Sequence, residues 1–158
     1  MVVFEKEETN EIVLSKALEK GILIHKLLQY LPEIPPENRR QKLQELTPKG
    51  IEVPYQILDL MEKPEISDLF GKNSLPEVPI IGELNGQKLA GQIDRLVIRT
   101  DDILIIDYKT NKKVPKTVPD NYRVQLNAYR DLIKKIFPDR IVKSYLLWTE
   151  NLTLMEVQ

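Results

Sequence analysis

A pair of hydrophobic segments with charged residues at their ends, Gly91–Thr110 (GQIDRLVIRTDDILIIDYKT), constrains the fold of this chain more than any other feature. Ile, Leu and Val dominate both segments, which predicts two β-strands joined by a short polar turn. The predicted strands are 91–99 and 103–109. A buried strand normally carries no charge, yet this stretch contains Asp94, Asp107 and Lys109. Because burial of an unpaired charge removes its hydration at a high free-energy cost, we expect these side chains to lie together.

The clustering of these charges depends on the register of the predicted hairpin. Side chains alternate between the two faces of a strand, so Asp107 and Lys109 share one face. If Asp101 and Asp102 form a two-residue turn, Asp94 lies opposite Lys109 and joins that face. A slip of one residue would send Asp94 to the other face, so the cluster rests on this assumed register.

Two interpretations of the charged cluster remain open. The first is a salt-bridged strand end without chemistry, because ion pairs of this kind are common in folded proteins. The second is a cation site, because two carboxylates and an ammonium are less costly to bury when a divalent cation lies between the carboxylates. Carboxylate oxygens and water are ligands that suit Mg²⁺ or Mn²⁺.

Composition restricts the class of protein. The chain has 158 residues, the length of one domain, and no cysteine, so disulfides, zinc–thiolate sites and iron–sulfur clusters are excluded. No stretch approaches the roughly 20 apolar residues of a membrane span, and the start MVVFEKEETN does not resemble a signal peptide. We therefore expect a soluble, cytoplasmic protein. The net charge is −1, so contact with nucleic acid requires a local basic patch, and the G-x-x-x-x-G-K-[ST] motif of an ATP site is absent.

The N-terminal part, residues 11–72, is predicted to be helical. Residues 1–10 are polar and expected to be frayed. The first helix is predicted from Asn10 to Leu31, and Pro32 ends it. One stripe of this helix, with spacings of three and four residues, is predicted to be buried: Leu14, Leu18, Gly21, His25 and Leu28.

His25 is the only histidine of the chain, and two interpretations of it are open. It could be a core histidine satisfied by a hydrogen bond. It could also direct its imidazole from the helix toward the sheet, where it would be available to a metal ion. Gly21 lies one turn earlier and would allow another backbone to approach the helix closely.

Residues 75–158 are predicted to form the sheet core. Asn85-Gly86 is a strong hairpin signal, so three antiparallel strands are expected before the helix at 121–137. The predicted strands are 77–84, 87–99, 103–109, 141–149 and 152–157. The fold class is therefore α/β, a single domain over 1–158 with a mixed central sheet of about five strands flanked by helices. Glu77 and Glu83 are interpreted as solvated charges near the edge of the sheet.

Two further segments could contact a phosphate. The loop 110–120 carries Lys112, Lys113 and Lys116, which would suit a phosphate backbone or would simply be solvated. On the helix 121–137 one stripe contains Gln125, Tyr129, Leu132 and Ile136. Gln125 and Tyr129 could be core residues, or they could reach the charged end of the sheet.

Four motifs in this order resemble the RecB-like branch of the PD-(D/E)xK nuclease superfamily. They are G-I-L-I-H (21–25), G-Q-I-D (91–94), D-Y-K-T (107–110) and Q-L-N-A-Y (125–129). The similarity runs from about residue 12 to the C-terminus and is greatest to the C-terminal nuclease domain of AddA-type helicase–nucleases, which act in double-strand-break repair. It implies the restriction-endonuclease-like core of that superfamily.

The resemblance also implies roles for individual residues. His25, Asp94, Asp107 and the carbonyl of Tyr108 would bind Mg²⁺ or Mn²⁺, and Lys109 would position or deprotonate the attacking water. Asp94 and Asp107 would thus also count as catalytic, and Gln125 and Tyr129 would organise the site or contact the DNA strand. No iron–sulfur cluster is expected, since the branch that carries one needs cysteines.

The function implied by the resemblance is metal-dependent cleavage of DNA in recombinational repair. The substrate would be single-stranded DNA, and the activity that of an exonuclease fed by a helicase. The expected partners are a helicase portion, in the same polypeptide or complex, and a second subunit of the AddB type. One alternative is a nuclease-like domain that binds DNA or a partner without cutting. Another is a site-specific restriction-type endonuclease, which the lack of an evident base-reading element disfavours.

Overall fold

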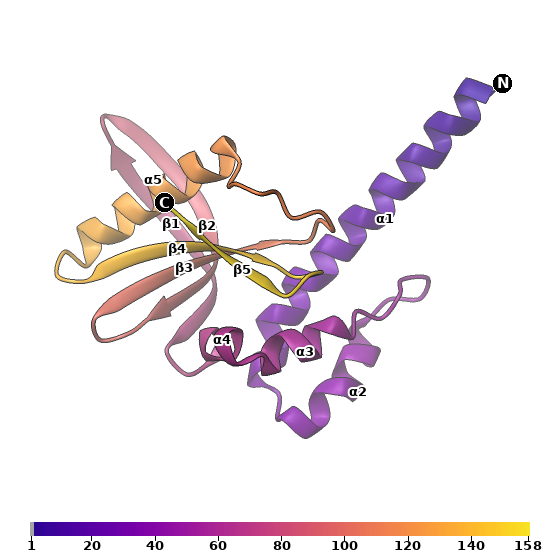
Figure 1. Cartoon of the computed structure of the whole chain (residues 1–158), viewed down its shortest axis with the longest axis horizontal. Coiled ribbons are helices and arrows are strands. Elements are labelled where there is room, and N and C mark those ends of the chain that lie inside the picture. Colours follow the sequence, from indigo (N-terminus) through magenta and orange to yellow (C-terminus); the bar gives the residue numbers. More distant parts are fainter. Residues whose placement is uncertain (1) are drawn as a thin grey trace.

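The computed structural model describes the backbone of residues 2–158 and the side chains of residues 13–158. One mixed sheet, in the order β1-β2-β3-β4-β5, is covered by helices on both faces (Figure 1). The strands are β1 (Ser74–Leu84), β2 (Gln87–Ile98), β3 (Asp102–Lys109), β4 (Ile141–Trp148) and β5 (Thr153–Val157). The helices are α1 (Val2–Tyr30), η1 (Leu31–Glu33), α2 (Pro36–Leu46), α3 (Gln56–Glu62), α4 (Pro64–Ser67), η2 (Asp68–Phe70) and α5 (Asp120–Ile136). The predicted α/β fold with a mixed sheet of about five strands is confirmed.

The connections explain why the sheet is mixed. Tight turns join β1 to β2, β2 to β3 and β4 to β5, and each of these pairs is antiparallel. Helix α5 connects β3 to β4 and returns the chain to the end of the sheet at which β3 begins, so these two strands are parallel. The helix thereby lies against one face of the sheet, directly after the strand that carries Asp107 and Lys109.

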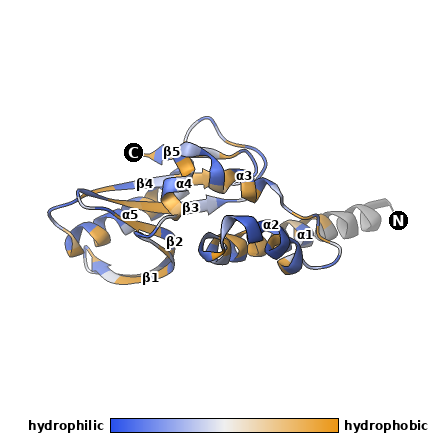
Figure 2. Ribbon diagram, turned by 90° about the horizontal axis from the view of Figure 1, so that it is seen from below, coloured by the Kyte–Doolittle hydropathy of each residue, from blue (hydrophilic) through white to orange (hydrophobic). Residues whose placement is uncertain are grey.

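Two hydrophobic clusters fill the space between the layers. Helices α1 to α4 cover one face through Leu27, Leu28, Leu43, Ile57 and Leu60, against Val97, Leu104, Ile106 and Leu147. Helix α5 covers the other face through Leu126, Tyr129, Leu132 and Ile133, against Leu96, Ile103, Ile105 and Leu146. Figure 2 shows hydrophobic residues in the strands and in the helices that cover them. Among the helices of the described chain, none is both long and apolar enough to cross a membrane.

Helix α1 differs from its prediction at the N-terminal end. Its backbone is helical from Val2, within the segment that we predicted to be frayed. The predicted buried stripe is correct at Leu28, which is fully buried, and wrong at Leu14 and Leu18, which are 69% and 67% exposed. The reason is that this part of α1 extends away from the sheet (Figure 1), so no described residue covers it.

Helix α5 keeps only part of its predicted stripe. Tyr129 and Leu132 are buried, whereas Gln125 and Ile136 are exposed. The face that contacts the sheet is rotated slightly, because Leu126 and Ile133 also pack into the core.

The turns of the first two hairpins were predicted with different success. Between β1 and β2, Asn85 and Gly86 have φ of 51° and 79°, as a type I′ turn requires, and this prediction is confirmed. Between β2 and β3 the predicted turn at Asp101-Asp102 is wrong by one residue, because Arg99 N–H donates to the carbonyl of Asp102. The Arg99 guanidinium also donates two hydrogen bonds to the Asp102 carboxylate, at 2.6 and 2.7 Å, which stabilises this shorter pairing.

Candidate functional site

Three carboxylates lie in a row across the first three strands. The β1–β2 register places Glu77 opposite Asp94, and the β2–β3 register, continued by one pair, places Asp94 opposite Asp107. The predicted partner of Asp94 was Lys109, so the predicted register is wrong by two residues. Because an even shift leaves every side chain on its face, Asp94 still shares a face with Asp107 and Lys109.

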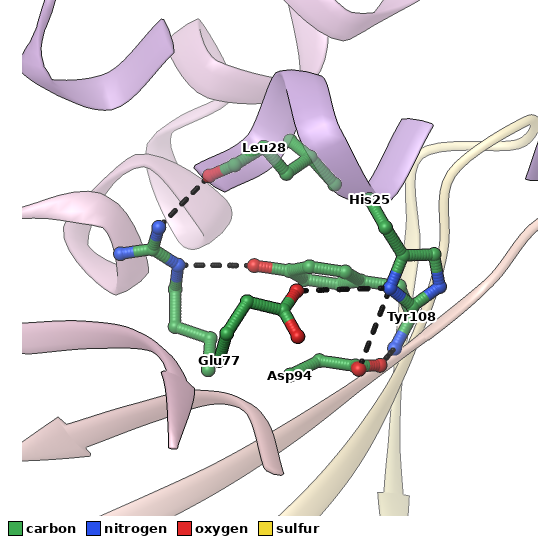
Figure 3. Close-up of polar contacts among 6 residues, drawn as sticks. His25, Leu28, Glu77, Asp94 and Tyr108 are labelled. Atoms are coloured by element: carbon green, nitrogen blue, oxygen red, sulfur yellow. Dashed lines mark hydrogen bonds and ion pairs between the residues drawn. The ribbon is translucent and has the colours of Figure 1, made fainter. Parts of the chain in front are cut away.

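His25 reaches this row from helix α1. Its Nδ1 atom lies 3.4 Å from Asp94 Oδ1 and 3.9 Å from Glu77 Oε1 (Figure 3). Ligand atoms of these three residues all lie within 4.8 Å of one another. The interaction with Asp94 raises the pKa of His25, with a smaller contribution from the charge of Glu77, and this outweighs the opposing effect of burial. The imidazole therefore faces the carboxylates and is placed for a cation.

Glu77 is a residue of this group that the sequence analysis missed. Its interpretation as a solvated edge charge is wrong, because its side chain is 22% exposed and faces His25, whereas Glu83 is exposed as expected. Burial, followed by the charge of Asp94, raises the pKa of the Glu77 carboxyl. Its φ of 50° lies in the left-handed region, which few non-glycine residues adopt. Counting pairs back from the Asn85-Gly86 turn would have placed Glu77 opposite Asp94.

Asp107 and Lys109 form the second half of the cluster. Lys109 Nζ lies 2.8 Å from Asp107 Oδ2, and both side chains are largely buried. The Lys109 ammonium is thus the cationic partner of this buried carboxylate oxygen. Burial, together with the charge of Asp94, raises the pKa of Asp107. The ammonium of Lys109 also lies 3.8 Å from the centre of the Tyr122 ring on α5.

Tyr108 joins the two halves of the cluster. Its backbone N–H donates to Asp94 Oδ2 at 2.8 Å, which fixes that carboxylate beside β3. Its side chain points to the opposite face of the sheet from Asp107, and its ring lies 5.4 Å from the His25 ring, edge to face. Burial raises the pKa of the Tyr108 hydroxyl, so the ring stays neutral.

Gln125 and Tyr129 lie beside β2. Gln125 Nε2 donates to the Tyr129 hydroxyl at 3.2 Å. The Tyr129 ring packs over Gly91, three residues before Asp94, where any side chain would overlap it. Among the described residues, neither Gln125 nor Tyr129 forms a hydrogen bond or ion pair with the carboxylates of the cluster. The structure therefore places this motif near the site without direct contact.

The surroundings of the cluster are open to a ligand. A hollow of about 380 Å³ lies beside His25 and is lined also by Leu18, Ile22 and Thr110. Gly21 allows this close approach, since a Cβ there would lie 3.3 Å from Thr110 Oγ1. The loop that follows is exposed at its three lysines, and none of them forms an ion pair with a described residue: Lys112, Lys113 and Lys116.

The residues present fit a divalent cation. An imidazole nitrogen and two carboxylates, those of His25, Glu77 and Asp94, offer ligand atoms within 4.8 Å of one another, and the strand register places Asp107 next to Asp94 outside that group. Oxygen-rich donor sets of this kind suit Mg²⁺ and Mn²⁺. The strongest indication is the row of three neighbouring carboxylates, Glu77, Asp94 and Asp107, of which only Asp107 forms an ion pair with a lysine among the described residues. A divalent cation would compensate the remaining negative charge of this row.

The chain is similar to one protein family, to curated relatives and to a solved structure. The family model of the PD-(D/E)XK nuclease superfamily matches residues 5–151. An ATP-dependent helicase/nuclease subunit from Streptococcus pyogenes serotype M3 is 26% identical over 80% of this chain, and the match covers 12% of that protein. The protein of the same name from serotype M1 matches equally, so the chain spans about one eighth of the length of these relatives. The solved crystal structure of SSO0001 matches 96% of this chain and 78% of its own, at 19% identity and a TM-score of 0.42.

Proposed function

The chain belongs to the PD-(D/E)XK nuclease superfamily, and on this premise we propose that it is a metal-dependent DNA nuclease. The observation that carries the proposal is the row of Glu77, Asp94 and Asp107 across three strands, with His25 on one side and Lys109 on the other. Phosphodiester hydrolysis needs an activated water and a means of neutralising charge on the phosphate. The site has groups suited to both tasks.

We assign the metal ligands as His25, Asp94, Asp107 and the carbonyl of Tyr108, with Glu77 as an additional carboxylate. Mg²⁺ or Mn²⁺, when bound, would supply a Lewis acid that activates water and neutralises phosphate charge. A histidine binds a metal ion through an unprotonated ring nitrogen, so a metal ion at Nδ1 would replace any proton on the side of the ring that faces Asp94. The single domain needs no ATP site and no iron–sulfur cluster for this reaction.

Lys109 is assigned the role of orienting the attacking water and stabilising the charge that develops on the phosphate. Its ammonium lies against Asp107 and over the Tyr122 ring, so it is held in one place as a cation. A charge that is fixed before the reaction stabilises the transition state without reorganisation at that moment. Gln125 and Tyr129 are assigned to organise β2 beside Asp94 through the contact of Tyr129 with Gly91.

The substrate that we propose is single-stranded DNA delivered by a helicase during double-strand-break repair. The hollow beside His25 opens next to Thr110, and the three exposed lysines of the loop after Thr110 are suited to phosphates. The similarity to the helicase/nuclease subunit of Streptococcus pyogenes supports a helicase partner. A second subunit of the AddB type is part of the same proposal. Such a role fits a cytoplasmic location.

The test is cleavage of linear single-stranded DNA of unrelated sequences with Mg²⁺ or Mn²⁺. Wild-type protein is compared with Asp107→Ala and Lys109→Ala, and with Asp101→Ala and Lys88→Ala as controls, since the control residues are exposed and remote from the cluster. We expect cleavage that needs the metal, is lost in the first two variants and is kept in the controls. Cleavage at one sequence only would instead indicate a restriction-type enzyme.

Metal binding separates the remaining outcomes. No cleavage, together with calorimetric metal binding that is lost in Asp107→Ala, would mean that the site is competent and requires a partner to deliver DNA. Neither cleavage nor metal binding would contradict the proposal and favour a domain that binds DNA or protein without cutting.

A further inference from the structure

Arg95 is a buried arginine that directly follows Asp94 in the sequence but lies outside the cluster. It follows Asp94 on β2, points to the opposite face of the sheet, and is 2% exposed. Its guanidinium forms no ion pair with any described carboxylate. Because an unpaired buried charge is costly, the hydrogen bonds that compensate it indicate what it does.

The guanidinium of Arg95 forms hydrogen bonds with α1, β1 and β3, the three other elements that supply the residues of the cluster. Its Nε donates to the Tyr108 hydroxyl at 3.0 Å, on β3. One terminal nitrogen donates to Ser74 Oγ at 2.6 Å, at the start of β1, and the other to the carbonyl of Leu28 at 2.8 Å, on α1. A planar group with donors in fixed directions can hold three partners at once, which a lysine ammonium on a flexible stem does less well.

These contacts bear on the position of His25 in two ways. Leu28 lies three residues after His25, so the bond to its carbonyl fixes the turn of α1 that carries the imidazole. Arg95 donates a hydrogen bond to the hydroxyl of Tyr108, and the centre of the Tyr108 ring lies 5.4 Å from that of the His25 ring (Figure 3). The centre of the Phe70 ring lies 6.5 Å from that of Tyr108. Arg95 itself lies 4.8 Å from the centre of the Phe70 ring. The ring against which His25 packs is therefore held by Arg95 at its hydroxyl and by Phe70, which stacks on it.

We propose that Arg95 is the positioning residue of the metal site: it fixes α1 and Tyr108 so that His25 and the Tyr108 backbone face Asp94. It contacts no reacting group, and its effect passes through Leu28 and Tyr108. This inference rests on the proposed function only for the identity of the cation. It predicts that Arg95 is needed for the affinity of the metal, beyond any contribution that it makes to folding.

The first test compares Mn²⁺ binding by calorimetry in wild type, Arg95→Lys and Arg39→Lys. Arg39 is the matched control, because its guanidinium too donates three hydrogen bonds, in its case to the backbone carbonyls of Leu31, Pro32 and Ile34, away from the cluster. Loss of a residue that orients metal ligands typically weakens binding about 10- to 100-fold. We expect a loss of that order in Arg95→Lys and none in Arg39→Lys, although both substitutions lower stability.

The second test uses His25 as a unique reporter, since the chain has one histidine. The ring Cε1–H signal of His25 in the NMR spectrum of the metal-free protein should shift or broaden in Arg95→Lys and stay in place in Arg39→Lys. If Arg95→Lys does not fold, Tyr108→Phe replaces it, because that change removes only the acceptor of the Nε hydrogen bond and keeps the ring. We expect Tyr108→Phe to weaken Mn²⁺ binding and move the His25 signal in the same direction.

The outcomes distinguish this inference from the proposed function. Folded Arg95 or Tyr108 variants with wild-type Mn²⁺ affinity and an unchanged His25 signal would overturn the positioning role while leaving the nuclease proposal intact. A wild-type protein that binds no Mn²⁺ would overturn the metal site. In that case the His25 signal alone decides whether Arg95 positions the imidazole.

Discussion

The contact between Gly91 and Tyr129 gives a prediction whose magnitude follows from the structure. A Cβ added at Gly91 would lie 2.8 Å from Tyr129 Cζ and 2.9 Å from Cε1, and closer still to the hydroxyl oxygen. Tyr129 is buried, so its ring cannot move aside without disturbing its neighbours on α5 and β2. Gly91→Ala should therefore displace the ring or separate α5 from the sheet.

The expected loss of stability is about 2 kcal/mol. Overpacking of a filled core costs up to about 3 kcal/mol. Replacement of a strand glycine by alanine stabilises the protein by about 1 kcal/mol, because the unfolded chain loses conformational entropy. For a chain of this length, 2 kcal/mol corresponds to a fall in Tm of roughly 4–8 °C. Cleavage should fall too, since Tyr129 and Gln125 are assigned to organise the site.

The assay is thermal and urea unfolding of Gly91→Ala, with Gly71→Ala as the matched control. At Gly71 the nearest atom to an added Cβ is the Asp68 carbonyl oxygen at 3.6 Å, an ordinary contact, so this variant should be as stable as wild type or slightly more so. Tyr129→Leu in the Gly91→Ala background should recover part of the loss, because it removes the overlapping atoms. If Gly91→Ala is as stable as Gly71→Ala, the close packing of Tyr129 on β2 is refuted.

Three further predictions concern the cluster itself. Tyr122→Phe keeps the ring under Lys109 and should preserve cleavage. Tyr122→Leu removes the ring and should slow cleavage about two- to thirtyfold, which corresponds to about 0.5–2 kcal/mol. Steady-state cleavage rates of the two variants check this prediction. Asp94 raises the pKa of His25 above its ordinary 6.5. The interaction of protonated His25 with Asp94 therefore stabilises the metal-free protein fully below pH 6.5, and this stabilisation is lost as pH rises through the folded-state pKa. Urea unfolding across this range should show the loss in wild type and not in His25→Gln, and an equal slope in both would contradict it. Mn²⁺ at about 100 times its dissociation constant should raise the free energy of unfolding by about 2.7 kcal/mol in wild type and leave Asp94→Asn unchanged, as measured by calorimetry of unfolding.

The sequence predicted the sheet and the face of the charged cluster because both depend on periodicity. The alternation of apolar and charged residues along 91–109 survives any even shift of register, so the turn could be misplaced by one residue without moving Asp94 to the wrong face. The Asn85-Gly86 turn was predictable for a local reason, since both residues tolerate positive φ.

Glu77 and Arg95 could not be assigned from pattern alone. Glu77 lies in a segment with two prolines, which suggests an edge strand, and no sequence signal marks its left-handed backbone, which lies between the pairs Pro76–Arg95 and Val78–Ile93. Arg95 looks like an ordinary strand residue until the elements that surround it are known. Its partners lie 13, 21 and 67 residues away, so only the tertiary structure brings them together.

Helix α1 shows the limit of amphipathic pattern. Leu14 and Leu18 have the spacing of a buried stripe, yet burial requires a partner, and the described chain provides one only from about Leu23 onward. The pattern predicted the helix and the side of it on which His25 lies. The point at which the helix meets the sheet depends instead on the close approach of Gly21 to Thr110.

The most direct test of the central claim is anomalous diffraction from crystals of the wild-type protein soaked with Mn²⁺. We expect an anomalous peak that marks a Mn²⁺ ion bound by Asp94 and Asp107, with His25 among the ligands at the distances usual for Mn²⁺. A saturating soak with no peak in the cluster, or with peaks only at exposed carboxylates elsewhere, would contradict the assignment of a metal site to this row of residues.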